Sequence, residues 1–319
     1  EAVELVEAVE TSGKIYAYGE NYCYMPAPKE MKKLYQEGRL GELEYAEGEY
    51  IHNCEPIWAD ITYGDKNHWR NGMYATFYCT HSLGPLIHIT GLKPKTVVGF
   101  ELPFTEICAR MGLRAGVGGI EMVTLNNGAV VRSLHGNLNK GSTRYQLQGS
   151  KGRMESASED LLNGGVSRIY TNFDEYEGEN GNHPKTYLPK DKMSKAAFEM
   201  ESHFGSDYYL LYNFVQAVKH KRADIIDVYE ALDMFLPGLF AWFSILDGNK
   251  AQTIPDLKNK EERDEWRNDV RCTDLEVAGE EALPSYARCK LDVPDEVYDL
   301  VRQKYLLNKQ KNKKSGGKD

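Results

Sequence analysis

The stretch GGIEMVTLNNGAVVRSLHG, residues 118–136, decides the fold. Apolar and polar side chains alternate along residues 118–125 and again along 129–136, which is the period of a β-strand. Asn127 and Gly128, between them, form a dipeptide that favours the tight turn of a β-hairpin. Similar strand patterns lie at residues 41–52, 96–102 and 143–150. Short strands that follow one another through tight turns predict a largely antiparallel sheet.

Helical patterns flank these strands on both sides. Apolar residues recur at helical spacing in five segments, residues 1–10, 26–36, 81–89, 206–221 and 227–247. Thr80 is placed to cap the third helix and Gly91 to end it, while Pro237 is expected to kink the fifth. Residues 14–22 predict one more strand, and residues 155–200 a long irregular segment. The layout predicts the α+β class: an open, mostly antiparallel β-sheet with helices packed on one face.

The bulk composition excludes several classes of protein. The chain has 319 residues, a net charge of −9 and a pI near 5.5, so it lacks the basic face of a nucleic-acid-binding protein. No run of about 18 apolar residues occurs, and we therefore expect no membrane span. The six cysteines form no C-x-x-C pair, which indicates buried free thiols in a reducing, cytoplasmic compartment. The basic run 309–314 lies in an expected flexible tail, residues 306–319.

One face of the first long strand carries an unusual set of side chains. Strand alternation places four residues on the same face, Ala46, Gly48, Tyr50 and His52. The two small residues predict open space above the sheet, with the phenol and the imidazole beside it. Glu20 precedes them in the motif GENYCY, so three proton-transferring groups are expected near one cleft. A plain polar surface is the alternative interpretation of this face.

A second candidate group lies in FYCTHSLGP, residues 77–85. Tyr78 and His81 flank the expected start of a helix. The positive end of the helix dipole favours a neutral imidazole, which suits a general base. A histidine that serves only the structure is the alternative.

Two further motifs supply candidate substrate ligands. HWRN places Trp69 and Arg70 in a loop, where a stacking ring beside a five-donor guanidinium suits a sugar. ESHFGSDYY places His203 and Asp207 just before a helix, although Asp207 alternatively does no more than complement the helix dipole. No metal site is expected, because His52 and Cys54 have no matching second pair of ligands nearby in the sequence.

Four segments together resemble the C-terminal domain of Gfo/Idh/MocA-type oxidoreductases. They include the motifs ENYCYMP, YCTHSLGP, YQLQGSKGRMES and SHFGSDYYLLYNF, and they lie at residues 20–52, 78–94, 145–156 and 202–256. In that family a Rossmann domain binds NAD(P). The second domain is an open sheet that covers the nicotinamide, contacts the substrate and often pairs subunits. The resemblance implies a sugar or glycoside substrate and a homo-oligomer formed through the sheet face.

A dinucleotide-binding turn is not found in this sequence. The glycine-rich segment 112–119 does not fit G-x-G-x-x-G, and a strand pattern follows it. The resemblance implies that residues 1–20 are the end of a nucleotide-binding domain and that residues 21–305 form the sheet-based substrate and oligomerisation domain. The Rossmann domain itself is expected to be absent. An intact parent protein or a separate Rossmann-bearing segment would then hold NAD(P), and binding by this chain alone is not expected.

A departure from the dehydrogenases points to one branch of the family. Many of these enzymes carry an aspartate four residues before the catalytic histidine, where this chain has Phe77. The segment from Tyr78 to His81 resembles instead the Tyr-x-Thr-His of NAD-dependent α-N-acetylgalactosaminidases. The implied roles are catalytic for His81, Tyr78 and Tyr50, cofactor-binding for Glu20 and His52, and substrate-binding for Trp69, Arg70, His203 and Asp207.

The sequence leaves three functions open. The leading hypothesis is hydride transfer between a sugar ring carbon and nicotinamide, with His81 as base or acid for the hydroxyl proton. The second is a glycosidase that oxidises a ring carbon transiently, removes the acidified neighbouring C–H proton with Tyr78 or His81, and eliminates the glycosidic group. The third is a non-catalytic domain that binds sugar or pairs subunits. Net consumption of NAD separates the first function from the second.

Overall fold

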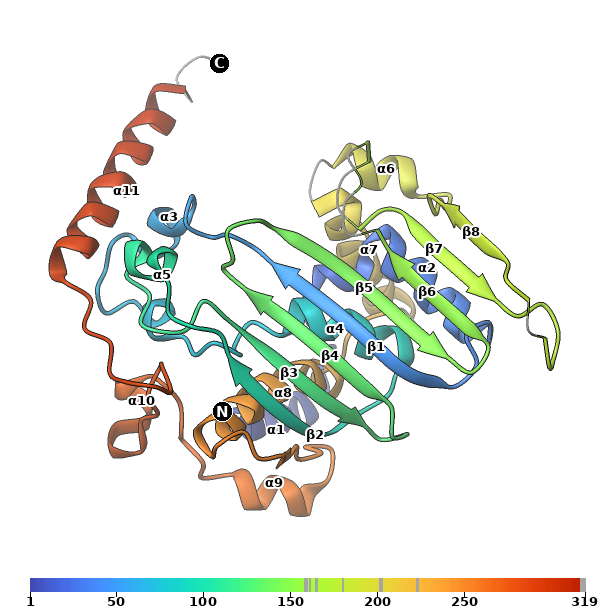
Figure 1. Ribbon diagram of the computed structural model, residues 1–319, viewed down its shortest axis with the longest axis horizontal. Helices are drawn as coiled ribbons and strands as arrows, with labels where there is room; N and C mark the ends of the chain where they lie inside the picture. Colours follow the sequence, from blue (N-terminus) through green and yellow to red (C-terminus); the bar gives the residue numbers. More distant parts are fainter. Residues whose placement is uncertain are drawn as a thin grey trace.

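One sheet of nine strands organises the computed structural model (Figure 1). The structure describes residues 1–157, 160, 162–163, 166–179, 181–200, 203–221 and 224–315. The strands lie in the order β8-β7-β6-β5-β1-β4-β3-β2-β9. Their bounds are β1 Leu43–Ile51, β2 Pro94–Glu101, β3 Gly118–Leu125, β4 Val130–Gly136, β5 Ser142–Gly149, β6 Gly152–Ser156, β7 Ile169–Phe173, β8 Pro184–Tyr187 and β9 Gln252–Thr253.

Neighbouring strands pair antiparallel everywhere except between β1 and β4. The predicted hairpin joins β3 to β4, with Thr124 opposite Val130 and Gly128 in the turn at a φ of 89°. The parallel pair places Gly48 of β1 opposite Ser133 of β4. The prediction of an α+β fold with a mostly antiparallel sheet is confirmed, and the parallel pair makes the sheet mixed.

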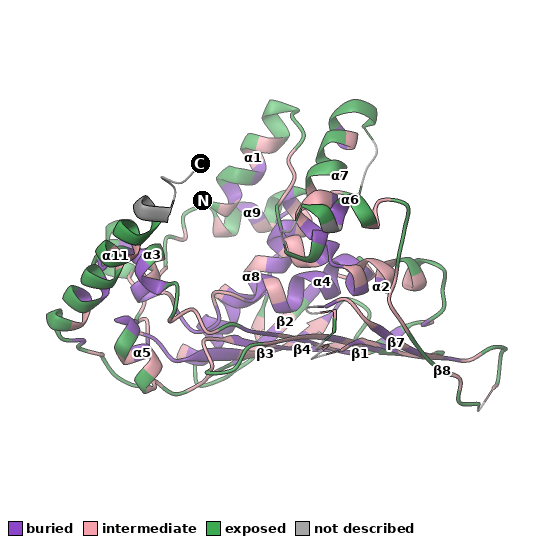
Figure 2. Ribbon diagram, turned by 90° about the horizontal axis from the view of Figure 1, so that it is seen from above, coloured by how far each residue is buried: buried purple, intermediate pink, exposed green. Residues whose placement is uncertain are grey.

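The longer helices lie on one side of this sheet and leave its other face uncovered by helices in the described residues (Figure 2). The α-helices are α1 Ala2–Ser12, α2 Pro26–Gln36, α3 Trp58–Thr62, α4 Thr80–Thr90, α5 Glu106–Met111, α6 Ser194–Glu199, α7 Ser206–His220, α8 Val228–Leu246, α9 Lys260–Trp266, α10 Leu275–Ala278 and α11 Asp295–Ser315. Short 3-10 helices are η1 Asn21–Tyr24, η2 Trp69–Gly72, η3 His203–Gly205 and η4 Gly279–Glu281. The core fills the layer between the sheet and α2, α4 and α8.

Helix α4 lies directly on β1 because position 48 has no side chain. A Cβ atom on Gly48 would lie 1.8 Å from the backbone oxygen of Ser82, in the first turn of α4. The Ser82 hydroxyl extends the contact to β4, where it lies 2.8 Å from the hydroxyl oxygen of Ser133. The prediction that Ala46 and Gly48 leave open space above the sheet is therefore wrong, because α4 fills that space.

Helix α8 covers β2 by the same device. A Cβ atom on Gly99 would lie 2.3 Å from the backbone oxygen of Ala241, and the Gly99 N–H donates to Ser244 Oγ at 3.1 Å. The helix runs through Pro237 without interruption. It is long and apolar enough to cross a membrane by length and composition alone, but 61% of its apolar window is buried inside the fold. Such burial is typical of a core helix.

Residues 14–22 do not form the predicted strand. Tyr18 donates its N–H to the carbonyl of Ile226 at 2.9 Å, but no strand pairs with this segment among the described residues. The chain then enters η1, whose first turn is capped by Glu20. Alternating side chains suit a strand, but a strand also requires a neighbour for its backbone hydrogen bonds, and sequence alternation does not supply one.

Smaller differences concern the ends of elements. Cys79, and not Thr80, occupies the N-cap position of α4, and Thr80 is its first helical residue. The segment predicted to be irregular, residues 155–200, contains β7, β8 and α6. Helix α11 continues to Ser315, so most of the predicted tail is helical, and residues 316–319 lie outside the described residues. All six cysteines are free, as predicted, but the prediction that they are buried is wrong for Cys54, Cys272 and Cys289.

Replacing Gly48 with alanine is expected to destabilise the protein by about 1–3 kcal/mol, the usual cost of overpacking a core. The added methyl group would push α4 away from β1. Chemical denaturation measures the effect. Gly19→Ala is the matched control, because its Cβ would meet only Leu210 Cδ1 at 3.8 Å, and it should not lower stability. Equal stability of the two variants would contradict the tight contact.

Candidate active site

The residues predicted for catalysis meet where β1 ends and α4 begins. Tyr50 of β1 and His81 of α4 make an edge contact with ring centroids 4.6 Å apart. Tyr78, just before α4, stacks on Tyr50 at 5.9 Å. Tyr22 of η1 completes the group, with its ring centroid 4.5 Å from that of His81. Three segments that are distant in sequence thus surround one imidazole with phenols.

His81 is held at its ring and at its backbone. Its Nδ1 lies 2.6 Å from Glu20 Oε1, and because a carboxylate only accepts, Nδ1 carries the hydrogen. Glu20 is only 1% exposed, and the same oxygen accepts the N–H of Tyr22 at 3.2 Å. The Tyr145 hydroxyl donates to the His81 carbonyl at 2.5 Å. The Nε2 of His81 is therefore the ring nitrogen left for a ligand, on a side chain that is 17% exposed.

Tyr50 and His52 form a second hydrogen-bonded pair. The Tyr50 hydroxyl lies 2.9 Å from His52 Nδ1 and donates to the neutral ring. Burial lowers the pKa of His52, and the nearby charge of His81 lowers it further. Burial also raises the pKa of Tyr50 well above its usual range, and the phenols of Tyr22 and Tyr78 add to this shift. Tyr50 is therefore a protonated donor at neutral pH.

The predicted pair Trp69 and Arg70 lies beside Tyr78. The Arg70 guanidinium is 4.7 Å from the Trp69 ring centroid and 6.0 Å from that of Tyr78. Burial raises the pKa of Tyr78, and the positive charge of Arg70 opposes that shift. Trp69 and Phe77 also line a neighbouring cavity of about 970 Å³. Arg70 thus connects Tyr78 to Trp69, which borders a cavity of ligand size that the imidazole itself does not line.

His203 and Asp207 reach the site through η1. The His203 Nδ1 lies 2.9 Å from Asp207 Oδ2, and Asp207 Oδ1 accepts the side-chain N–H of Asn21 at 3.2 Å. Asn21 follows Glu20 directly, so this pair supports the segment that carries the carboxylate partner of His81.

Sequence reasoning missed two tyrosines of this site. Tyr22 contacts both Tyr50 and His81, and Tyr145 holds the backbone of His81. Each lies inside a motif that carries the family resemblance, ENYCY for Tyr22 and YQLQGS for Tyr145. Their presence in those motifs was the available signal.

Part of the chain is similar in sequence to a known protein family. Residues 115–266 match the family model of the glycosyl hydrolase 109 C-terminal domain. The match spans β3 to β9 and α6 to α9. Of the site residues described above, it includes Tyr145, His203 and Asp207, whereas β1, α4 and η1 lie before it. The predicted resemblance is confirmed, both to this glycosyl hydrolase group in sequence and to oxidoreductases in fold.

Two curated relatives and one solved structure illustrate the likeness. A glycosyl hydrolase family 109 protein of Solibacter usitatus is 24% identical over 282 residues, which cover 81% of this chain and 63% of the relative. An α-N-acetylgalactosaminidase of Bacteroides fragilis is 33% identical over 117 residues, covering 35% of this chain and 28% of the relative. A levoglucosan dehydrogenase solved with NADH and L-sorbose superimposes with a TM-score of 0.62 at 15% identity, covering 81% and 71% of the two chains. The chain thus spans less than two thirds of the Solibacter relative.

Replacing Tyr50 with phenylalanine is expected to raise the pKa of His52 toward its ordinary value. The lost hydroxyl is the donor that stabilises the neutral imidazole, so protonation becomes easier without it. An NMR pH titration of the histidine ring signals measures the change. Tyr45→Phe is the control on the opposite face of β1, where the hydroxyl donates to Glu47. A His52 pKa unchanged by the Tyr50 variant would contradict the assigned hydrogen bond.

Proposed function

We propose that this chain forms the substrate side of an NAD-dependent glycosidase site that acts on an α-N-acetylgalactosaminide-like glycoside. The observation that carries the proposal is the placement of His81. Its ring is hydrogen-bonded to the buried Glu20 and contacts the phenol rings of Tyr50 and Tyr78. The match of residues 115–266 to glycosyl hydrolase 109 supports the reaction class. The name of the Bacteroides relative supports the sugar.

Phe77 favours the glycosidase over a simple dehydrogenase. Many dehydrogenases of the resembled family carry an aspartate at this position, but here the ring packs against Trp69 at 5.6 Å and Phe235 at 5.7 Å. The carboxylate that orients His81 comes instead from Glu20, 61 residues earlier. A different carboxylate, that of Glu20, therefore holds the imidazole. The position of the dehydrogenase aspartate is occupied by the aromatic ring of Phe77.

The chemistry of the donor set fits the nicotinamide end of NAD. Tyr22, Tyr50 and Tyr78 offer flat faces for a ring, and His52 and Arg70 offer polar groups at the border of the cluster. Glu20 is buried and engaged with His81, so we assign it to positioning that histidine instead of to the ribose contact inferred from the sequence. When bound, nicotinamide accepts a hydride from a sugar ring carbon and returns it at the end of the cycle.

The residues of the chain handle protons around that hydride exchange. His81 Nε2 accepts the proton of the sugar hydroxyl as the carbon is oxidised, and returns it at the end. Oxidation acidifies the neighbouring C–H, and Tyr78 or His81 removes that proton. His81 does so after it has passed the hydroxyl proton to solvent, and Tyr78 does so as its phenolate, which the positive charge of Arg70 favours. The electron pair forms a C=C bond while the bond to the glycosidic oxygen breaks, and that oxygen takes up a proton, so the aglycone leaves as an alcohol. Tyr50 donates a hydrogen bond, since its high pKa keeps its proton in place.

Water then completes a redox-neutral cycle. It adds across the C=C bond, which restores the C–H bond and supplies the hydroxyl that replaces the glycosidic group. Trp69, Arg70, His203 and Asp207 are proposed to border the sugar. Trp69 and Arg70 do so from the side of Tyr78, and His203 and Asp207 from the side of η1.

Net sugar oxidation is the second candidate, because the levoglucosan dehydrogenase shares the fold. A non-catalytic domain that binds sugar or pairs subunits through the sheet face is the third. Upstream sequence with G-x-G-x-x-G and Glu-Lys-Pro would argue against the third function.

Incubation with NAD and a nitrophenyl α-N-acetylgalactosaminide in D₂O separates these functions. The glycosidase should release nitrophenol without net NADH, and the product sugar should carry deuterium next to the oxidised carbon. His81→Gln should lower the rate by about 10²–10⁴-fold. His220→Gln, at the exposed end of α7, should not. NADH in proportion to oxidised sugar would favour the dehydrogenase, and sugar binding without either product would favour the non-catalytic domain.

A further inference from the structure

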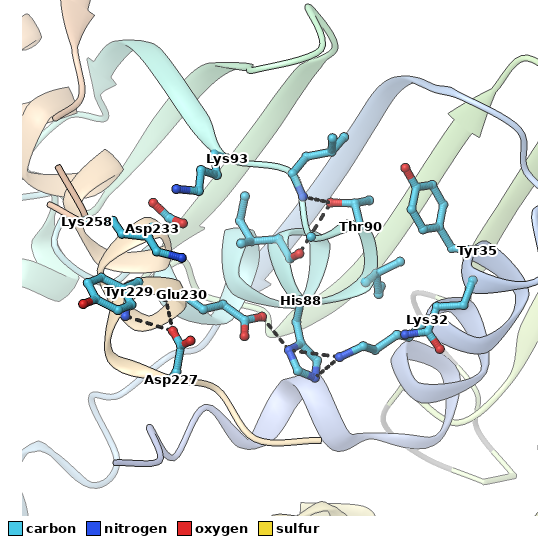
Figure 3. Close-up of a pocket in the computed structure, with 15 residues that line it drawn as sticks. Lys32, Tyr35, His88, Thr90, Lys93, Asp227, Tyr229, Glu230, Asp233 and Lys258 are labelled. Atoms are coloured by element: carbon cyan, nitrogen blue, oxygen red, sulfur yellow. Dashed lines mark hydrogen bonds and ion pairs between the residues drawn. The ribbon is translucent and has the colours of Figure 1, made fainter. Parts of the chain in front are cut away.

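A second cavity, of about 480 Å³, lies at the C-terminal end of α4 (Figure 3). Helices α2, α4 and α8 and the segments after α4 and β9 contribute its walls. Its volume lies in the usual range of small-molecule pockets, roughly 300–1,000 Å³. Helix α4 carries His81 in its first turn and this cavity at its last, so the two sites are separated by about 15 Å of helix.

Lys32, His88 and Glu230 line one wall of the cavity. Together with Asp224, which does not line it, they form a set of mutually paired charges, here called the His88 cluster. His88 is 3% exposed; its Nδ1 lies 2.6 Å from Glu230 Oε1 and its Nε2 2.8 Å from Lys32 Nζ. Lys32 also pairs with Asp224 at 2.5 Å. Burial lowers the pKa of His88, but Asp224 and Glu230 raise it, and the net shift is upward. This cluster joins α2, α4 and α8 and has little capacity left for a ligand.

Asp233 differs from every carboxylate in that cluster. It accepts no hydrogen bond and forms no ion pair within 4 Å in the part of the chain that the structure describes. Lys93, the nearest cation in its surroundings, is held by Asp256 at 2.8 Å. Figure 3 shows Asp233 beside Lys93 and Lys258, with no interaction drawn from its carboxylate. Its side chain faces the cavity without a partner of its own.

Several negatively charged groups surround Asp233. Burial raises its pKa to about 7, the charge of Lys93 opposes the shift, and Asp256, Glu230 and Asp227 add to it. The C-terminal carbonyls of α4 add the negative end of a helix dipole. Lys258 lies over the Tyr229 ring at 5.5 Å. A cationic ligand would complete this arrangement.

We propose that this cavity binds a small ligand with an ammonium group on a compact apolar or ring-shaped body, and that Asp233 receives the ammonium. The rings of Tyr35 and Tyr229 and the side chain of Leu92 line the cavity and suit such a body. An anionic ligand would meet Asp227, Glu230 and Asp233. Of the three lysines that line the cavity, Lys32 and Lys93 are already paired, and Lys258 lies over the Tyr229 ring. The described residues hold no group of three side chains placed to bind a metal ion.

Two probes of equal shape test the proposal, cyclohexylammonium and cyclohexanol. They differ only in the ammonium group, and cyclohexylammonium stays charged between pH 6 and 8. NMR titrations of the labelled chain at pH 8 follow the backbone amides of residues 90–92. The wild type should bind cyclohexylammonium at least tenfold more tightly than cyclohexanol, and this preference should vanish in Asp233→Asn. A preference that survives this variant, or no preference in the wild type, would overturn the proposal.

The pH dependence has a definite sign. Asp233 is mostly ionised at pH 8 and mostly protonated at pH 6, so binding of cyclohexylammonium should weaken by about tenfold on going from pH 8 to pH 6. Asp233→Asn should lose most of this pH dependence, and the remainder belongs to His88, the other group in the cavity wall whose pKa is raised. Binding by the wild type that strengthens toward pH 6 would contradict the assignment of Asp233.

Two further variants keep the test independent of folding. Asp299→Asn makes the same change of charge on an exposed turn of α11 and should leave the preference intact. Tyr35→Leu should weaken binding of both probes several-fold while keeping the preference for ammonium. Asp233→Asn itself should unfold at no lower denaturant concentration than the wild type at pH 8, because it removes a partly buried carboxylate without a partner. Loss of the preference in Asp299→Asn would overturn the proposal.

Discussion

The close approach of α4 to β1 is the constraint on which the site depends. With no side chain at Gly48, the carbonyl of Ser82 lies where a Cβ atom would otherwise be. This contact fixes the height of the first turn of α4 above the sheet, and His81 stands in that turn. Tyr50 lies two residues further along β1, so the same contact sets the distance between its phenol and the imidazole. The packing of the core at Gly48 thereby sets the distance between Tyr50 and His81 in the candidate active site.

A hydrogen bond to a buried carboxylate then couples this scaffold to the segment before it. Glu20 lies at the start of η1 and reaches His81 across a gap of 61 residues in sequence. Since Glu20 is almost completely buried, its carboxylate depends on His81 and on the Tyr22 N–H for partners. Helix η1 and helix α4 therefore hold one another, and the exposed edge of the imidazole is what remains for a substrate.

Local signals in the sequence predicted the local parts of this structure. Asn127-Gly128 identified the hairpin, and alternation identified the face that carries Tyr50. Such local signals could not predict the contacts between segments that are distant in sequence. Gly48 looked like open space because the helix that fills it lies more than thirty residues away, and residues 14–22 lacked the pairing partner that their alternation implied. The family resemblance predicted that Glu20, Tyr50, Tyr78 and His81 belong to one site. It did not predict the hydrogen bond between Glu20 and His81.

The most direct test of this account is an NMR titration of the chain with methyl α-N-acetylgalactosaminide, followed on the histidine and tyrosine ring signals. The account predicts that the rings of His81, Tyr50 and Tyr78 shift together, while Tyr45 on the opposite face of β1 does not. Saturable shifts confined to rings outside this cluster would contradict it, as would the absence of any shift at His81 while the sugar binds elsewhere.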